Sequence, residues 1–232
     1  LGETIADLFV GNVSALSERE RTPMFDILHQ VVHDIEMTVR QTISAQLATF
    51  KETPPELAAM LANDEIEVAY PILTQSEVLQ DAQLIETIRN RTLEHQMAIA
   101  IRHTVPVVVS DALVETGDED IIRTLLENSG ARISQATMEY LVEESSRVNT
   151  FQEPIVRRHD LEPELAKRMF MWVSAALRKH IVENYDFDKS VVDDLLEKAA
   201  LQGAGGDTHA EQPHSKSDDL VAELAEENAV TP

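Results

Sequence analysis

Apolar residues recur every three or four positions along most of this chain, the spacing that places them on one face of an α-helix. The clearest runs are Ile35, Val39, Ile43 and Leu47; Ile121, Ile122, Leu125 and Leu126; and Leu165, Met169, Val173, Leu177 and Ile181. Strict alternation of apolar and polar residues, which indicates β-strands, is nearly absent. The pattern therefore predicts an all-α protein built from helices of about 8–15 residues.

Residues that start and stop helices divide these runs. Asn63, Thr92 and Ser134 are candidate N-caps, because their side chains can accept hydrogen bonds from free N–H groups of a first turn. Gly117 and Gly130 stand where helices are expected to end. Residues 163–184 contain no comparable interruption, so the sequence predicts one longer helix there, closing the domain.

The expected helix ends recur at a regular interval. Thr49, Ser76, His103, Ser129 and His159 each follow an apolar helix end, at separations of 27, 27, 26 and 30 residues. The residues four positions before these anchors are all apolar: Ala45, Ile72, Ile99, Leu125 and Ile155. A unit of this length holds two short helices and must stack on its neighbours to bury an apolar face. We expect one continuous core that includes the last four; an irregular helical bundle is the alternative.

Two sequence echoes support this register. The pattern RH-x-x-P at residues 102–106 resembles RH-x-x-x-P at 158–163, and PELA at 55–58 recurs at 163–166. The prediction is a HEAT-like α-solenoid of short antiparallel helix pairs over residues 20–200. A lead-in segment of residues 1–19 precedes it, and a flexible, disordered acidic tail of residues 201–232 follows it.

Charge narrows the possible partners. The 232 residues include 42 acids and 19 lysines and arginines, a net charge of −23. Such a surface repels nucleic acids and anionic membrane surfaces, so we expect neither as a partner. The longest uncharged apolar stretches are only nine residues long, and no basic and apolar leader is visible, so we expect no membrane span, no signal peptide and a cytoplasmic location. The absence of cysteine removes thiolate chemistry and disulfides.

Few residues carry recognisable chemistry. His29 and His33 are four apart, with Glu36 three further on, and could hold a metal on a continuous helix; a turn between them is the preferred interpretation. Glu94 and His95 are neighbours, but adjacent helical residues do not face each other, so His95 is expected to be a buried core histidine. No glycine-rich phosphate loop is present. We expect no metal, no cofactor and no catalytic residue.

Two charged surfaces are candidate partner-binding sites. Arg40, Glu67 and Arg123 fall in the first turns of the second helices of units, which would line one face of a solenoid. For acidic residues in these first turns, such as Glu67, the alternative is that their negative charge only complements the positive end of the helix dipole. The other surface is a basic stripe on the long helix, formed by Lys167, Arg168, Arg178 and Lys179. The acidic, amphipathic segment 217–228 could dock on this stripe within the molecule.

Five stretches together resemble an alphaproteobacterial family called domain of unknown function 2336. They are VHDIEMTVRQTIS (residues 32–44), LANDEIEVAYPIL (61–73), LIETIRNRTLEHQMAIAIR (84–102), VSDALVETGDEDIIRTLLENSGARIS (109–134) and QEPIVRRHDLEPELAKRMFMWVSAALRKHI (152–181). The resemblance covers about residues 20–185 and implies a HEAT-like helical protein. It implies no catalytic residues.

The function expected from these observations is non-enzymatic: an adaptor or regulatory module that binds a protein or peptide on its helical surface. One alternative is a sensor module that binds a small molecule in a pocket between helices. The other is an enzyme with a histidine–glutamate or metal site near His29, His33 and His95.

Overall fold

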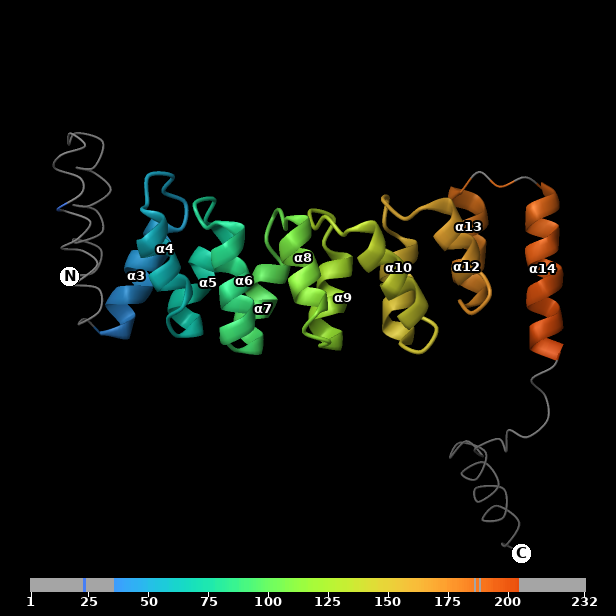
Figure 1. The fold of residues 1–232 in the computed structure, drawn as a ribbon, viewed down its shortest axis with the longest axis horizontal. Helices are drawn as coiled ribbons and strands as arrows, with labels where there is room; N and C mark the ends of the chain where they lie inside the picture. Colours follow the sequence, from blue (N-terminus) through green and yellow to red (C-terminus); the bar gives the residue numbers. More distant parts are fainter. Residues whose placement is uncertain (1–22, 24–35, 186, 188, 205–232) are drawn as a thin grey trace, which may run out of the picture. The chain divides into compact units, whose positions relative to one another are not determined.

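The computed structural model describes residues 23, 36–185, 187 and 189–204, and the chain divides into two units, residues 1–185 and 186–232. The division falls earlier than the predicted domain end at residue 200. The first unit contains α3 (Met37–Leu47), α4 (Pro55–Ala62), α5 (Ile66–Gln75), α6 (Asp81–Asn90), α7 (Leu93–Ala100), α8 (Val107–Val114), α9 (Glu119–Glu127), α10 (Gln135–Glu144), the 3₁₀ helix η1 (Asn149–Phe151), α11 (Gln152–Val156), α12 (Pro163–Met169) and α13 (Ala175–Asn184) (Figure 1). In the second unit the structure describes α14 (Lys189–Ala204).

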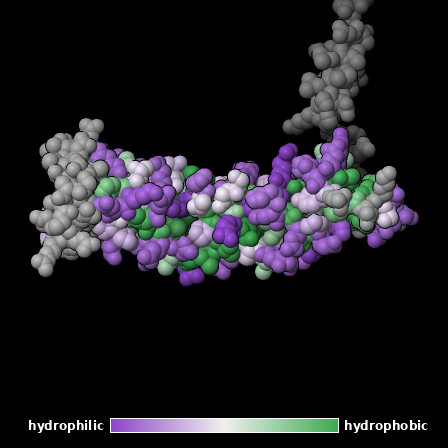
Figure 2. Space-filling model, turned by 90° about the horizontal axis from the view of Figure 1, so that it is seen from above, coloured by the Kyte–Doolittle hydropathy of each residue, from purple (hydrophilic) through white to green (hydrophobic). Residues whose placement is uncertain are grey.

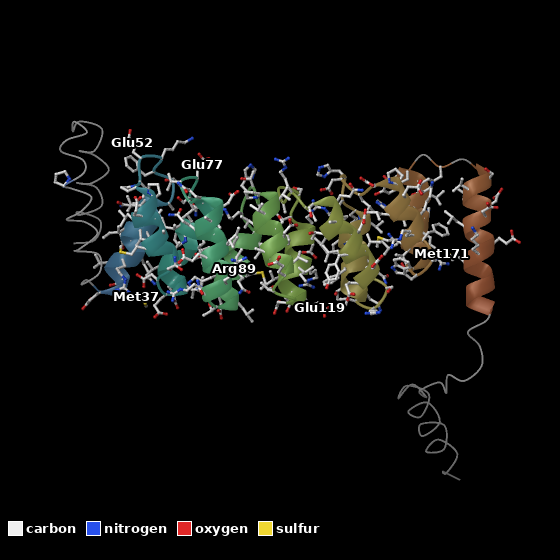
Figure 3. All side chains as sticks on the ribbon, in the orientation of Figure 1. Met37, Glu52, Glu77, Arg89, Glu119 and Met171 are labelled. Atoms are coloured by element: carbon white, nitrogen blue, oxygen red, sulfur yellow. The ribbon has the colours of Figure 1, made fainter. Side chains whose placement is uncertain are left out.

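The helices of the first unit form two rows. In what we call the second row, α3, α5, α7, α9, α11 and α13 each pack against the next. The first row consists of α4, α6, α8, α10 and α12. Met37 and Glu119, which begin α3 and α9, lie at the lower edge of Figure 3, whereas Glu52 and Glu77, which follow α3 and α5, lie at the upper edge. The second-row helices therefore run in the same direction, and the predicted solenoid fold is confirmed.

The core lies between the two rows, as the register predicts. Ile72, Ile99, Leu125 and Ile155 are all fully buried. Ala45 is exposed instead, because α3 presents a different set of positions to the core and buries Ile43 and Leu47. In Figure 2, hydrophobic residues are visible between hydrophilic ones along the length of the stack.

Truncating Leu125 to alanine is expected to cost about 2–5 kcal/mol of folding free energy, because the side chain is fully enclosed between the rows and its loss leaves a cavity. Glu127→Ala on the same helix is the control, since its side chain is exposed. Thermal unfolding measures both. Equal melting temperatures for the two variants would contradict the packing described here.

The predicted long helix at 163–184 is wrong: α12 ends at Met169 and α13 begins at Ala175. Ser174 caps the new helix by accepting a hydrogen bond from Leu177 N. Arg178 donates from Nε to Phe170 O and from Nη2 to Met171 O, which satisfies carbonyls at the end of α12. The longest described helix is α14, with 16 residues, and it belongs to the second unit.

Among the predicted caps, Ser134 is confirmed: its side chain accepts a hydrogen bond from Thr137 N at the start of α10. Thr92 precedes α7 as expected, but its hydroxyl meets a histidine ring rather than a backbone N–H group. Asn63 is wrong as an N-cap, because it ends α4.

Side chains from one unit satisfy the helix-end carbonyls of the unit before it. Arg102 donates to Leu73 O and Ser76 O at the end of α5. Asn128 donates to Ala100 O and Arg102 O beyond α7. The buried Arg158 does the same for the end of α9, where it donates to Leu126 O, Asn128 O and Ala131 O. The repeated RH pattern therefore marks arginines that join successive units.

The two arginines differ in how fully their N–H groups are used. Asp160 accepts from Nε and Nη2 of Arg158, so all five N–H groups of that guanidinium are used. Arg102 Nε is buried and has no hydrogen-bond partner among the described residues, and burial lowers the pKa of Arg102. Thr104 follows Arg102 by two residues, just as Asp160 follows Arg158 by two residues, so the two positions are equivalent.

Thr104→Asp is therefore expected to stabilise the fold by about 1 kcal/mol, because the new carboxylate can accept from Arg102 Nε. Thermal unfolding measures the effect, with Thr104→Asn as a control that has the same shape and no charge. The asparagine variant should gain less. A lower melting temperature for the aspartate variant would contradict the equivalence of the two arginines.

Candidate functional site

The outer positions of α5, α7 and α9 align in columns across the second row. Within one helix, the residues three and seven positions after an outward-facing residue lie on the same side as that residue. Equivalent residues of these successive units are 26 or 27 positions apart. The three columns are Glu67, Glu94 and Asp120; Tyr70, Met97 and Arg123; and Thr74, Ile101 and Glu127. We call these nine residues the second-row face.

Part of this face is apolar. Tyr70 is 47% exposed and Ile101 is 43% exposed, and Leu93, at the start of α7, is 57% exposed. They lie on or next to two helices, α5 and α7, that pack side by side. On the first row the exposed large hydrophobic residues are Val108 and Tyr140, one on each of two helices. Neighbouring exposed apolar side chains of this kind are typical of interaction surfaces.

The face continues into a hollow between α9 and α11. Two adjoining cavities of about 190 and 320 Å³ lie there and share Glu127, Pro154 and Arg157 as lining residues. The other lining residues are Arg123, Leu126, Ser129, Asn149, Thr150, Glu153, Arg158 and His159. The hollow occurs where the repeat spacing lengthens to 30 residues and where α11, with five residues, is the shortest α-helix described.

The two exposed arginines at this hollow are held weakly. Arg123 lies 3.7 Å from Asp120 and is 46% exposed, and Arg157 lies 2.8 Å from Glu153 and is 61% exposed. Exposed pairs of this kind contribute at most about 1 kcal/mol, so both guanidinium groups can change partners. The neighbouring Arg158 is fully committed to the fold, as shown above.

Arg40, by contrast, has a structural role. Its Nε lies 2.6 Å and its Nη2 2.9 Å from the two carboxylate oxygens of Asp64, and both side chains are mostly buried. Burial acts to raise the pKa of Asp64, but the hydrogen bonds and charge of Arg40 outweigh it, so this pKa is lowered. Arg40 therefore joins α3 to the turn before α5.

His95 is buried, as the sequence predicts. Its Nε2 donates to Asp64 O at 2.9 Å, because a carbonyl oxygen can only accept, and its Nδ1 lies 2.9 Å from the Thr92 hydroxyl. Both ring nitrogens are thus occupied. Glu94 is exposed on the outer side of the same helix, so the two neighbours lie on different faces.

Asp160 gives the fold an acid-sensitive contact. Burial would raise its pKa, but hydrogen bonds from Arg158 lower the pKa below the ordinary value. A depressed folded-state pKa contributes stability above about pH 4, and this stability is lost as the pH falls through the folded-state value. Asp160→Asn is therefore expected to melt below the wild type at pH 7, with a difference that shrinks at about pH 2–3. A pH-independent difference would contradict this assignment.

The predicted basic stripe does not lie on one long helix. Because the helix breaks after Met169, Lys167 and Arg178 lie on different helices, and Arg178 is directed back onto the end of α12, with its guanidinium 5.6 Å from the Phe170 ring centroid. The other three cations pair with acids: Lys167 with Glu164 at 2.6 Å, Arg168 with Glu143 at 2.6 Å, and Lys179 with Glu183 at 3.6 Å. The segment 217–228 lies outside the described residues.

No three histidine, aspartate or glutamate side chains in the described part of the chain lie close enough to hold a metal ion. His29 and His33 fall outside that part, so the expectation that they bind no metal stays a prediction. None of the described helices combines the length and apolar character that crossing a membrane requires.

Sequence reasoning found Glu67 and Arg123 of the second-row face but missed its apolar members. Tyr70, Met97 and Ile101 read as ordinary core positions in a run of apolar residues. The available signal was their helical spacing: Tyr70 and Met97 stand three residues after Glu67 and Glu94, which are themselves 27 residues apart.

Comparison of the sequence with known protein families gives one match. Residues 68–232 match the model of a family described as "Uncharacterised protein conserved in bacteria (DUF2336)". No curated protein and no solved structure matches the chain. The match spans α5 to the end of the chain and agrees with the family that the sequence resembles. The chain thus belongs to domain of unknown function 2336, a bacterial family.

Proposed function

We propose that this protein is a non-enzymatic adaptor or regulatory module that binds a protein segment on its second-row face. The observation that carries the proposal is the exposure of Tyr70, Leu93 and Ile101 on two adjacent, parallel helices. A face that only meets water gains nothing from large apolar side chains at these positions, whereas a bound partner removes them from water.

The hollow between α9 and α11 extends the same surface. It adds Arg123 and Arg157, whose present ion pairs are exposed and exchangeable. An elongated row of equivalent helices suits the binding of an extended or helical segment across several units. The small-molecule sensor and the enzyme near His29, His33 and His95 stay as alternatives without a supporting contact in the described residues.

Site-specific photo-crosslinking in bacterial cells tests this proposal. A photoreactive phenylalanine analogue replaces Met97 on the second row, or Val108 on the first row as the matched control. We expect discrete protein adducts from position 97 and few from position 108. Equal adducts from both positions, or none from position 97, would overturn the proposal.

A further inference from the structure

We infer that the second-row face accepts a basic amphipathic helix, with its apolar stripe on α5 and α7 and its lysines and arginines against the neighbouring acids. This inference rests on the proposed function and adds the chemistry of the partner. Amphipathic helices commonly bind by laying one apolar face on a complementary surface.

The apolar contact comes from equivalent positions on two helices. Tyr70 and Met97 occupy one column, and Ile101 lies one turn beyond Met97 on the same side of α7. Because α5 and α7 run in parallel and pack together, these side chains form a surface that spans both helices. A helix lying across it can bury residues spaced three or four apart, which fits an amphipathic stripe.

The charge comes from the acidic column beside this surface. Glu67 and Glu94 are exposed, and among the described residues neither forms an ion pair with a lysine or arginine. Glu65, the residue before α5, is also exposed. These carboxylates favour cationic side chains at the edge of the apolar contact, and the net charge of −23 attracts a basic partner from a distance.

The same charges disfavour three other occupants. Segment 217–228 of this chain contains five acids and no lysine or arginine, so the acidic column repels it. A second copy of the chain would bring a like-charged face against this one. Nucleic acid would bring phosphates against it.

The probe for this inference is a fluorescein-labelled peptide of about 14 residues, made of leucine and lysine so that the leucines lie on one helical face. One control peptide has the same composition in scrambled order, and another has glutamate in place of lysine. Fluorescence anisotropy with the full chain is expected to give a Kd of about 10 µM for the amphipathic basic peptide. Both control peptides should bind at least about tenfold more weakly.

Two charge-reversal variants locate the binding. E67K/E94K changes the second-row face, and E56K/E86K makes the same change in net charge on exposed residues of α4 and α6 in the first row. We expect E67K/E94K to weaken binding by about tenfold at low salt and by less at high salt, because the contact is partly electrostatic. E56K/E86K should weaken binding by less than about threefold.

A second pair of substitutions, Tyr70→Ser and Ile101→Ser, tests the apolar contact without changing charge. Both residues are exposed, so circular dichroism should show an unchanged fold. Equal weakening by the two charge-reversal variants, or equal binding of the acidic peptide, would overturn the inference, and so would the absence of binding. Crosslinks at position 97 together with any of these results would keep the proposed function and reject only its basic partner.

Discussion

Replacing Arg158 by methionine is expected to cost about 3–5 kcal/mol of folding free energy and to lower the melting temperature by about 10 °C. The residue is 6% exposed, and its five N–H groups serve three carbonyls at and just after the end of α9 and both carboxylate oxygens of Asp160. Methionine fills much of the volume but leaves these acceptors without partners in a buried place.

Arg157→Met is the matched control, one residue away on the same chain segment. Its guanidinium is 61% exposed and, in the described part of the chain, pairs with the exposed Glu153 alone, so its loss is expected to cost less than about 1 kcal/mol. Thermal unfolding of the two variants side by side makes the comparison. Similar losses for both would contradict the role of Arg158 in joining successive units.

Gly130→Ala is expected to cost about 2–4 kcal/mol, because there is no room for a Cβ atom. An added Cβ would lie 1.9 Å from His103 O and 2.9 Å from His103 C, and these are backbone atoms that cannot rotate away. The close approach is fixed by two hydrogen bonds between neighbouring loops, from Val105 N to Gly130 O and from Arg132 N to Val105 O.

Gly117→Ala provides the contrast. Gly117 has a φ of +72°, which favours glycine, but an added Cβ would meet no atom within 4 Å. The substitution is therefore expected to cost only about 1–2 kcal/mol of backbone strain. Chemical denaturation of both variants measures which substitution costs more folding free energy. A larger loss at Gly117 would contradict the loop contact at Gly130.

The sequence alone predicts the fold class and the core of this protein well. Helical periodicity and the anchor spacing correctly place Ile72, Ile99, Leu125 and Ile155 in one core. This succeeds from α5 to α11, because each of these units buries the same face against its neighbours. The register fails in α3, where Ala45 is exposed.

Local interruptions were harder to predict. The break at residues 170–174 falls inside an uncharged run whose one polar residue is Ser174, and it depends on Arg178 satisfying carbonyls of the preceding helix. The placement of the basic stripe on one helix was wrong because of this break, and the sequence gives no sign of the pairing of Arg168 with Glu143, 25 residues earlier. The repeated RH pattern was visible in the sequence. The role of its arginines was not, because it depends on hydrogen bonds to carbonyls of the preceding unit.

The candidate site was only half visible in the sequence. Charged residues such as Glu67 and Arg123 stand out on the outer positions of amphipathic helices. Tyr70, Met97 and Ile101 do not, because an apolar residue in a largely apolar helix gives no sign of whether it faces the core or the solvent.

Backbone amide NMR of the isotope-labelled chain, titrated with the basic leucine–lysine peptide, tests most directly whether the second-row face is the recognition surface. We expect the chemical-shift changes to cluster on the outer positions of α5 and α7, around Tyr70, Met97 and Ile101, and to extend toward Arg123. Changes centred on the first-row helices α4, α6, α8 and α10, or spread evenly over both rows, would contradict the proposed binding face.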